Sequence, residues 1–121
     1  MRCIIAGSRT ITDWKILASA IAASKFHITC VISGNACGMD LLGEEWAKNR
    51  NVPCDIYKAN WYKFGKSAGP IRNSEMANAS EALLLVWDGV SVGSKNMLET
   101  AKRKGLQIFE WNLGNKQQKL L

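Results

Sequence analysis

The chain has 121 residues, which is the size of a single domain. Hydrophobic residues make up 47% of it, enough to bury a core, and no apolar run is long enough to span a membrane. The formal net charge of +6 favours an anionic partner: a nucleotide, a nucleic acid or an acidic protein. Because the N-terminus also lacks a signal-peptide pattern, we expect a cytoplasmic protein.

Short apolar runs alternate with helical patterns along the chain. The expected strands cover residues 2–7, 27–33, 52–57, 81–87 and 106–111. The expected helices cover residues 14–24, 39–50, 70–79 and 95–104. Asp13 is the expected N-cap of the first helix, Pro70 the first residue of the third, and Gly105 the residue that closes the fourth. Residues 58–69 are expected to form a loop rich in aromatic residues, lysine and glycine.

This alternation predicts an α/β fold, a doubly wound parallel sheet of about five strands with helices on both faces. Residues 1–112 are expected to form one domain, and residues 113–121 a polar, basic C-terminal tail that frays. Trp14 and Trp46 are expected in the core, and Trp87 at the wall of a pocket.

Small and polar residues gather where three of the expected strands end. They are Gly7, Ser8, Arg9, Ser33, Gly34, Gly38, Asp88, Gly89, Ser91, Gly93 and Ser94. In doubly wound sheets, ligands bind at the carboxyl ends of the strands, where helix N-termini offer unpaired N–H groups. Glycine lets those groups approach a ligand closely. The pattern therefore predicts a cradle for a phosphate or a nucleotide.

Several other residues each have a functional and a structural interpretation. Asp40 and Glu44 share one helical face and could hold a ribose or act as acid and base on a glycosidic bond. Alternatively, Asp40 favours a helix N-terminus and Glu44 pairs with Lys48.

The segment that follows the aromatic loop is ambiguous in the same way. Arg72 and Asn73, with Lys66 and Ser67, could grip a phosphate or form a solvated helix start. Trp61 could stack on a base or pack against the fold.

Four stretches of the sequence resemble the SLOG superfamily, named for the Smf/DprA and Lonely-guy proteins, and within it the YspA-like, YpsA-related branch. They are "AGSR" at 6–9, "SGNACGMDLLGEEWA" at 33–47, "ANWYKFGKSAGPIRNSEM" at 59–76 and "VWDGVSVGSKNMLETAKRKG" at 86–105. The resemblance implies a Rossmann-like fold that binds a nucleotide or a nucleotide-derived ligand. The wider superfamily includes phosphoribohydrolases, which cut the N-glycosidic bond of nucleoside monophosphates, and proteins that bind DNA.

The sequence departs from the hydrolase pattern in one loop. Lonely-guy enzymes carry a GGxGTxxE-type loop with a catalytic glutamate three residues after the threonine. Here Ser94 takes the place of the threonine and Met97 that of the glutamate. Glu99 lies two residues further on, about 200° around the helix, and cannot simply substitute. Cys37 also stands where the family often has an arginine.

The sequence is compatible with three functions. Because the catalytic glutamate of the Lonely-guy enzymes is missing, we favour the first of these over the second. The first is a binding domain for a nucleotide or nucleotide derivative. The second is a nucleoside-phosphate N-glycosidase that uses Asp40 or Glu44. The third is a nucleic-acid-binding protein, with weak binding through the cluster Lys102, Arg103 and Lys104. We expect a homo-oligomer with no cofactor. We also expect no metal: no CxxC pair is present, which argues against a zinc ribbon.

Overall fold

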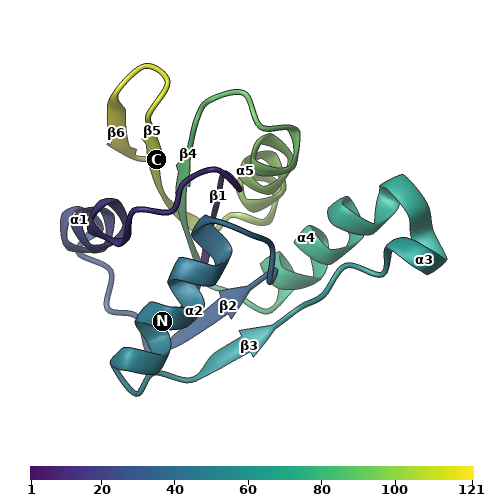
Figure 1. Cartoon of the computed structure of the whole chain (residues 1–121), viewed down its shortest axis with the longest axis horizontal. Helices are drawn as coiled ribbons and strands as arrows, with labels where there is room; N and C mark the ends of the chain where they lie inside the picture. Colours follow the sequence, from purple (N-terminus) through teal and green to yellow (C-terminus); the bar gives the residue numbers. More distant parts are fainter.

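The computed structural model describes residues 1–121, which form a six-stranded sheet between two layers of helices (Figure 1). The strands are β1 (Arg2–Gly7), β2 (Cys30–Ser33), β3 (Cys54–Ile56), β4 (Ala82–Trp87), β5 (Gln107–Asn112) and β6 (Gln117–Leu120). The helices are α1 (Trp14–Ser24), α2 (Met39–Asn49), α3 (Trp61–Phe64), α4 (Ala68–Asn78) and α5 (Val92–Lys104), with a 3₁₀ turn, η1, at Gly65–Ser67. None of these helices is both long and apolar enough to cross a bilayer.

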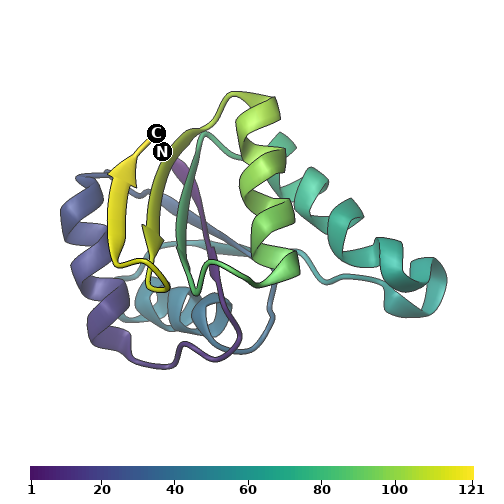
Figure 2. The ribbon, with the colours of Figure 1, turned by 90° about the horizontal axis from the view of Figure 1, so that it is seen from above.

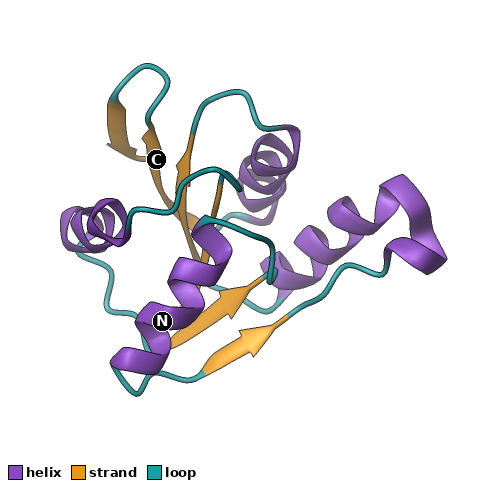
Figure 3. Ribbon diagram, in the orientation of Figure 1, coloured by secondary structure: helices purple, strands orange, loops and turns teal.

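The strand order is β3-β2-β1-β4-β5-β6, and every pair from β3 to β5 is parallel. The chain builds outward from β1 to β3 on one side and then returns to add β4 on the other side of β1. The direction of winding therefore reverses between β1 and β4, whose carboxyl ends lie next to each other (Figure 3). The predicted α/β, Rossmann-like fold is confirmed.

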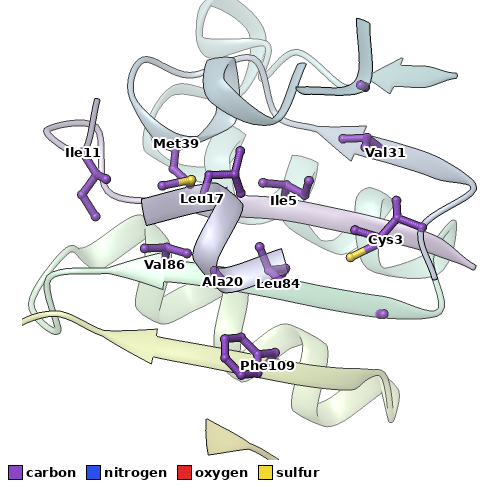
Figure 4. Close-up of a cluster of buried hydrophobic side chains, with 13 residues drawn as sticks. Cys3, Ile5, Ile11, Leu17, Ala20, Val31, Met39, Leu84, Val86 and Phe109 are labelled. Atoms are coloured by element: carbon purple, nitrogen blue, oxygen red, sulfur yellow. The ribbon is translucent and has the colours of Figure 1, made fainter. Parts of the chain in front are cut away.

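Helices cover both faces of the sheet, with α1 and α2 on one side and α4 and α5 on the other (Figure 2). Each face has its own apolar cluster. On the first face, Leu17 and Ala20 of α1 and Met39 of α2 pack on Ile5 and Leu84 (Figure 4). On the second, Met76 of α4 and Met97 of α5 belong to a cluster with alternate residues of the same strands. β4 is buried along its whole length, as a central strand of a covered parallel sheet must be.

The helix ends follow the sequence signals at most positions. The Asp13 side chain accepts a hydrogen bond from the backbone N–H of Lys15 at 3.0 Å, as expected of an N-cap. Gly105 ends α5 in the left-handed conformation, with φ of 74°, as predicted. Trp14, however, is 64% exposed rather than in the core, because it is the first residue of α1 and Leu17 takes the inward position.

The C-terminal segment differs from the expected tail. Residues Gln117–Leu120 form β6, which pairs antiparallel with β5 and closes a hairpin at the edge of the sheet (Figure 2). The sheet thus has six strands rather than about five. All four residues of β6 are exposed, so backbone hydrogen bonding holds this strand, and no hydrophobic pattern marked it in the sequence.

The expected loop at 58–69 is also partly helical. It contains α3 and η1, and α4 begins at Ala68, so Pro70 is the third residue of its helix rather than the first. Proline is tolerated there because the first N–H groups of a helix have no intrahelical partner. With α4, this segment forms an arm that projects beyond the sheet (Figures 1 and 2).

Two matched leucine substitutions test where the fold derives its stability. Leu84 is fully buried in β4, whereas Leu120 in β6 is 64% exposed. We expect Leu84→Ala to lower the free energy of unfolding by about 2–5 kcal/mol and Leu120→Ala by less than about 0.5 kcal/mol. Urea unfolding followed by circular dichroism measures both values. A comparable loss for the two variants would contradict this description of the core.

Candidate functional site

A cleft of about 450 Å³ opens at the carboxyl edge of the sheet, where the winding reverses between β1 and β4. Its walls come from the loop after β1, the start of α5, the first turns of α4 and the Trp61 side chain of α3. The predicted site residues that line it are Gly7, Ser8, Arg9, Asp40, Arg72, Asn73, Asp88, Ser91, Gly93 and Ser94. Gly34 lines a second, smaller hollow beside the cleft.

The loop between β4 and α5 is folded around the carboxylate of Asp88. Its Oδ1 accepts hydrogen bonds from the N–H groups of Val90 and Ser91, both at 2.9 Å, and from Ser91 Oγ at 2.8 Å. These bonds stabilise the charged form and lower the pKa of Asp88 to about 2. Ser91 Oγ also lies 3.1 Å from Ser8 Oγ, which accepts from the N–H of Asp88 at 2.9 Å. The loops after β1 and β4 are therefore joined.

This loop delivers the N-terminus of α5 into the cleft, three residues earlier than the sequence predicted. The first N–H groups of an α-helix have no intrahelical partner and carry a partial positive charge. A side chain added at Gly93 would meet no atom within 4 Å, so the space beside this turn is open. Arg9, exposed near the start of the loop after β1, lines the same cleft. The arrangement suits a phosphate or another anion.

Arg72 is fixed against the loop that follows β2. Its Nη1 donates to the carbonyl oxygen of Gly34 at 2.8 Å, and its Nε donates to Asn73 Oδ1 at 3.2 Å. A Cβ at Gly34 would lie 2.8 Å from Arg72 Nη1 and 2.9 Å from Asp40 Oδ2. Only glycine leaves room for both charged groups at this point.

Asp40 is buried, and its Oδ2 accepts a hydrogen bond from the backbone N–H of Ala36 at 3.2 Å. Desolvation raises the pKa of Asp40 to about 6, although that hydrogen bond and the positive charge of Arg72 oppose the shift. Burial in turn lowers the pKa of Arg72. A carboxyl group that changes protonation near neutral pH therefore faces the cleft.

Glu44 does not face the cleft with Asp40. It accepts hydrogen bonds from Ser33 Oγ at 2.6 Å and from Asn35 Nδ2 at 2.9 Å, so it shapes the loop after β2. The alternative pairing with Lys48 is not formed either, since the chain has a single ion pair, Arg2–Asp55.

Three other predicted site residues lie outside both hollows. Ser33 is fully buried, with its hydroxyl on Glu44. Gly38 is the N-cap of α2, where a Cβ would lie 2.4 Å from the Ser8 carbonyl oxygen. Gly89 takes a positive φ of 86° against Asn112. Ser33 therefore supports the loop after β2 through its hydroxyl, and the two glycines meet backbone requirements; none of the three lines a hollow.

Trp87 also differs from its expected place at the pocket wall. It is buried, and its Nε1 donates to Glu110 Oε2 at 2.8 Å.

Some lining residues carried no clear signal in the sequence. Asn96 holds Asn73 in place by accepting from its Nδ2 at 2.9 Å. Met97, which occupies the position of the hydrolase glutamate, is buried and lines the cleft. Glu99 is exposed and lies outside the cleft, as its rotation around the helix predicts.

Comparisons with known proteins agree with this architecture. Residues 1–64 match the model of the YAcAr family, described as the YspA, cpYpsA-related SLOG family. The Gene 61 protein of Mycobacterium phage D29 is 32% identical over 125 residues, which covers 95% of this chain and 98% of that protein.

The fold is similar to that of DNA processing protein A (DprA) from Streptococcus pneumoniae, with a TM-score of 0.71 and 17% sequence identity. The likeness covers 90% of this chain and 49% of DprA, so the chain spans about half the length of that protein. At this identity the comparison is one of fold.

The raised pKa of Asp40 makes a prediction about stability. Because its pKa is about 6 in the folded chain and 3.8 ordinarily, the folded state binds a proton that the unfolded state has lost between these values. The burial of a charged Asp40 thus costs stability above pH 6, and the cost is relieved as the pH falls. Relative to Asp40→Asn, the wild-type chain should gain about 2 kcal/mol of unfolding free energy between about pH 7.5 and pH 4.5.

Urea unfolding of both proteins across this range measures the difference. Asparagine keeps an oxygen that can accept from Ala36, so the substitution removes mainly the charge. The Asp88 carboxyl, with its pKa of about 2, stays charged throughout the range. If the unfolding free energies of the two proteins change in parallel with pH, Asp40 does not titrate within this pH range.

Proposed function

Because this chain belongs to the YspA, cpYpsA-related SLOG family, we propose that it binds a nucleotide or nucleotide-derived small molecule in the cleft at the carboxyl edge of its sheet. One observation carries the proposal. The loop after β1, the N-terminus of α5 and Arg72 converge on a single cleft at the reversal of the sheet.

The chemistry of the cleft supports each part of such a ligand. Unpaired N–H groups at the start of α5 and the guanidinium of Arg9 would receive a phosphate. Asp40 offers a carboxyl group for ribose hydroxyls. Trp61, half exposed at the rim, offers a face for a base.

The dimensions favour a small molecule over a nucleic-acid duplex. A volume of about 450 Å³ is typical of a small-ligand pocket. Lys102, Arg103 and Lys104 lie in the last turn of α5, where positive charge complements the helix dipole, at the opposite end of the helix from the cleft. Nucleic-acid binding through this cluster remains the weaker proposal.

A valine at Gly93 tests the cleft directly. The side chain would enter open space without displacing any protein atom, so the fold should persist while the phosphate position is filled. We expect Gly93→Val to weaken nucleotide binding at least tenfold in isothermal titration calorimetry with a panel of nucleoside monophosphates.

The matched control is Lys95→Val, which places the same side chain at an exposed position of the same helix, outside the cleft. Circular dichroism confirms that both variants fold. Equal affinities for wild type and Gly93→Val would remove the start of α5 from the site.

A second candidate function, N-glycosidic hydrolysis, is favoured by Asp40 alone. A carboxyl group with a pKa of about 6 can give and take a proton near neutral pH. Met97 stands against this candidate, because the position that holds the catalytic glutamate of the Lonely-guy enzymes is apolar here. Glu44 is held by Ser33 and Asn35 and does not line the cleft, and the Asp88 carboxylate is bonded to Val90 and Ser91 within its own loop, so neither is free to act with Asp40 as an acid–base pair.

Product analysis separates binding from hydrolysis. We expect little or no free base when the protein is incubated with nucleoside mono- and diphosphates and the mixture is resolved by chromatography. Turnover that Asp40→Asn abolishes and Glu99→Gln leaves intact would establish the hydrolase instead, since Glu99 is an exposed acid outside the cleft.

A further inference from the structure

A second hollow of about 280 Å³ opens beside the cleft. The two share Arg9, Ala36, Trp61 and Arg72, so they meet along a common wall. The far side of the second hollow is formed by the loop after β2, from Gly34 to Cys37, and by Lys58 and Ala59. The two spaces are therefore adjacent, with Arg9 and Arg72 at the border between them.

The charged residues that line the second hollow are all positive. Its charged residues are Arg9, Lys58 and Arg72, and no carboxylate lines it, whereas Asp40 and Asp88 line the larger cleft. The single ion pair of the chain joins Arg2 and Asp55, so none of these three cations is neutralised by an acid at ion-pair distance. Asp40 attracts Arg9 and Arg72 from the side of the larger cleft, but no acid lies in the second hollow itself, so its three cations favour an anionic group within it.

Arg72 is positioned to serve both spaces. Its Nη1 is held by the Gly34 carbonyl oxygen and its Nε by Asn73, which fixes the plane of the guanidinium. These bonds leave the Nη2 donors for a ligand, and a planar, charged donor is well suited to phosphate oxygens. Trp61 also borders both spaces, and its ring is close enough to α4 that a Cβ at Gly69 would lie 3.3 Å from it.

We infer that the ligand carries two phosphate groups, one at the start of α5 and a second in the hollow bounded by Arg9, Lys58 and Arg72. This inference rests on the proposed nucleotide-binding function and narrows its ligand class. Nucleosides phosphorylated at both the 5′ and 3′ positions have this chemistry, and so do short dinucleotides with a 5′ phosphate. A mononucleotide with one phosphate fills only the larger cleft.

Calorimetry with matched ligands tests the second phosphate. For each base, the nucleoside 5′-monophosphate is compared with the 3′,5′-bisphosphate and with the 5′-phosphorylated dinucleotide. We expect at least one of the two longer ligands to bind about tenfold more tightly than the monophosphate, because it gains a charge-assisted contact. The ligand that gains more identifies the source of the second phosphate.

Substitution of Lys58 tests whether the gain in affinity comes from the second hollow. Lys58→Ala should remove most of the tenfold gain and leave the affinity for the monophosphate within about twofold of wild type. Lys63→Ala is the control, since Lys63 lies on α3 near the Phe64 ring and lines neither space. Equal binding of mono- and bisphosphates, or a gain that survives Lys58→Ala, overturns the inference.

Alkylation of Cys37 gives an independent readout. Cys37 is exposed and lines the second hollow, whereas Cys3 and Cys30 are buried. A bound bisphosphate or dinucleotide should slow its reaction with iodoacetamide several-fold, as measured by peptide mass spectrometry, while the monophosphate should not. An unchanged rate with the tighter ligand overturns the inference. The proposed nucleotide-binding function survives such a result if monophosphates bind and Gly93→Val abolishes that binding. If no nucleotide binds at all, both the proposed function and the inference of a second phosphate are overturned.

Discussion

The close approach of β1 and β4 at their carboxyl ends is the contact on which the site depends. Gly7 lies so near β4 that a Cβ would be 1.7 Å from the Val86 carbonyl oxygen, and the N–H of Ser8 donates to that oxygen at 3.2 Å. This contact allows Ser8 to meet the loop after β4 through Asp88 and Ser91. Two loops far apart in the sequence thus form one wall of the cleft, and any side chain at Gly7 would separate them.

The lack of a glutamate in the cleft also determines the chemistry of the cleft wall. Met97 places an apolar surface where a hydrolase needs a charged group, and that surface continues into the core cluster around Met76. The wall is therefore apolar and closely packed at this point. Such a wall can shape a ligand's environment, but it offers no group to activate water. Two acids line the cleft: Asp88 is bonded to Val90 and Ser91 within its own loop, and Asp40 is buried and accepts from the Ala36 N–H.

The sequence could predict the fold and the elements of the cleft because both depend on local patterns. Apolar runs bounded by glycine, and helices opened by Asp13 or closed by Gly105, act over a few residues. It could not predict the partners of polar side chains, which depend on how the helices pack against the strands. Glu44 has Lys48 four residues away and yet bonds to Ser33, eleven residues earlier in the chain.

The edge strand β6 escaped prediction for a different reason. Its residues are all exposed, and the strand exists because β5 offers it unpaired backbone groups. The aromatic residues of the projecting arm were equally ambiguous, since Trp61 is 52% exposed and yet packs toward Gly69. Composition alone cannot distinguish an aromatic ring that packs against the fold from one that is free to stack on a ligand.

The hairpin of β5 and β6 links the end of the chain to the site. The N–H of Leu113 donates to the Trp87 carbonyl oxygen at 2.8 Å, Asn112 packs on Gly89, and Gly114 lies against the Asp88 carbonyl. Local unfolding starts most easily at an exposed sheet edge. Fraying that begins at β6 would therefore reach the loop before α5 sooner than the buried strands, which couples the order of the outermost, least buried strand to the order of the first turn of α5.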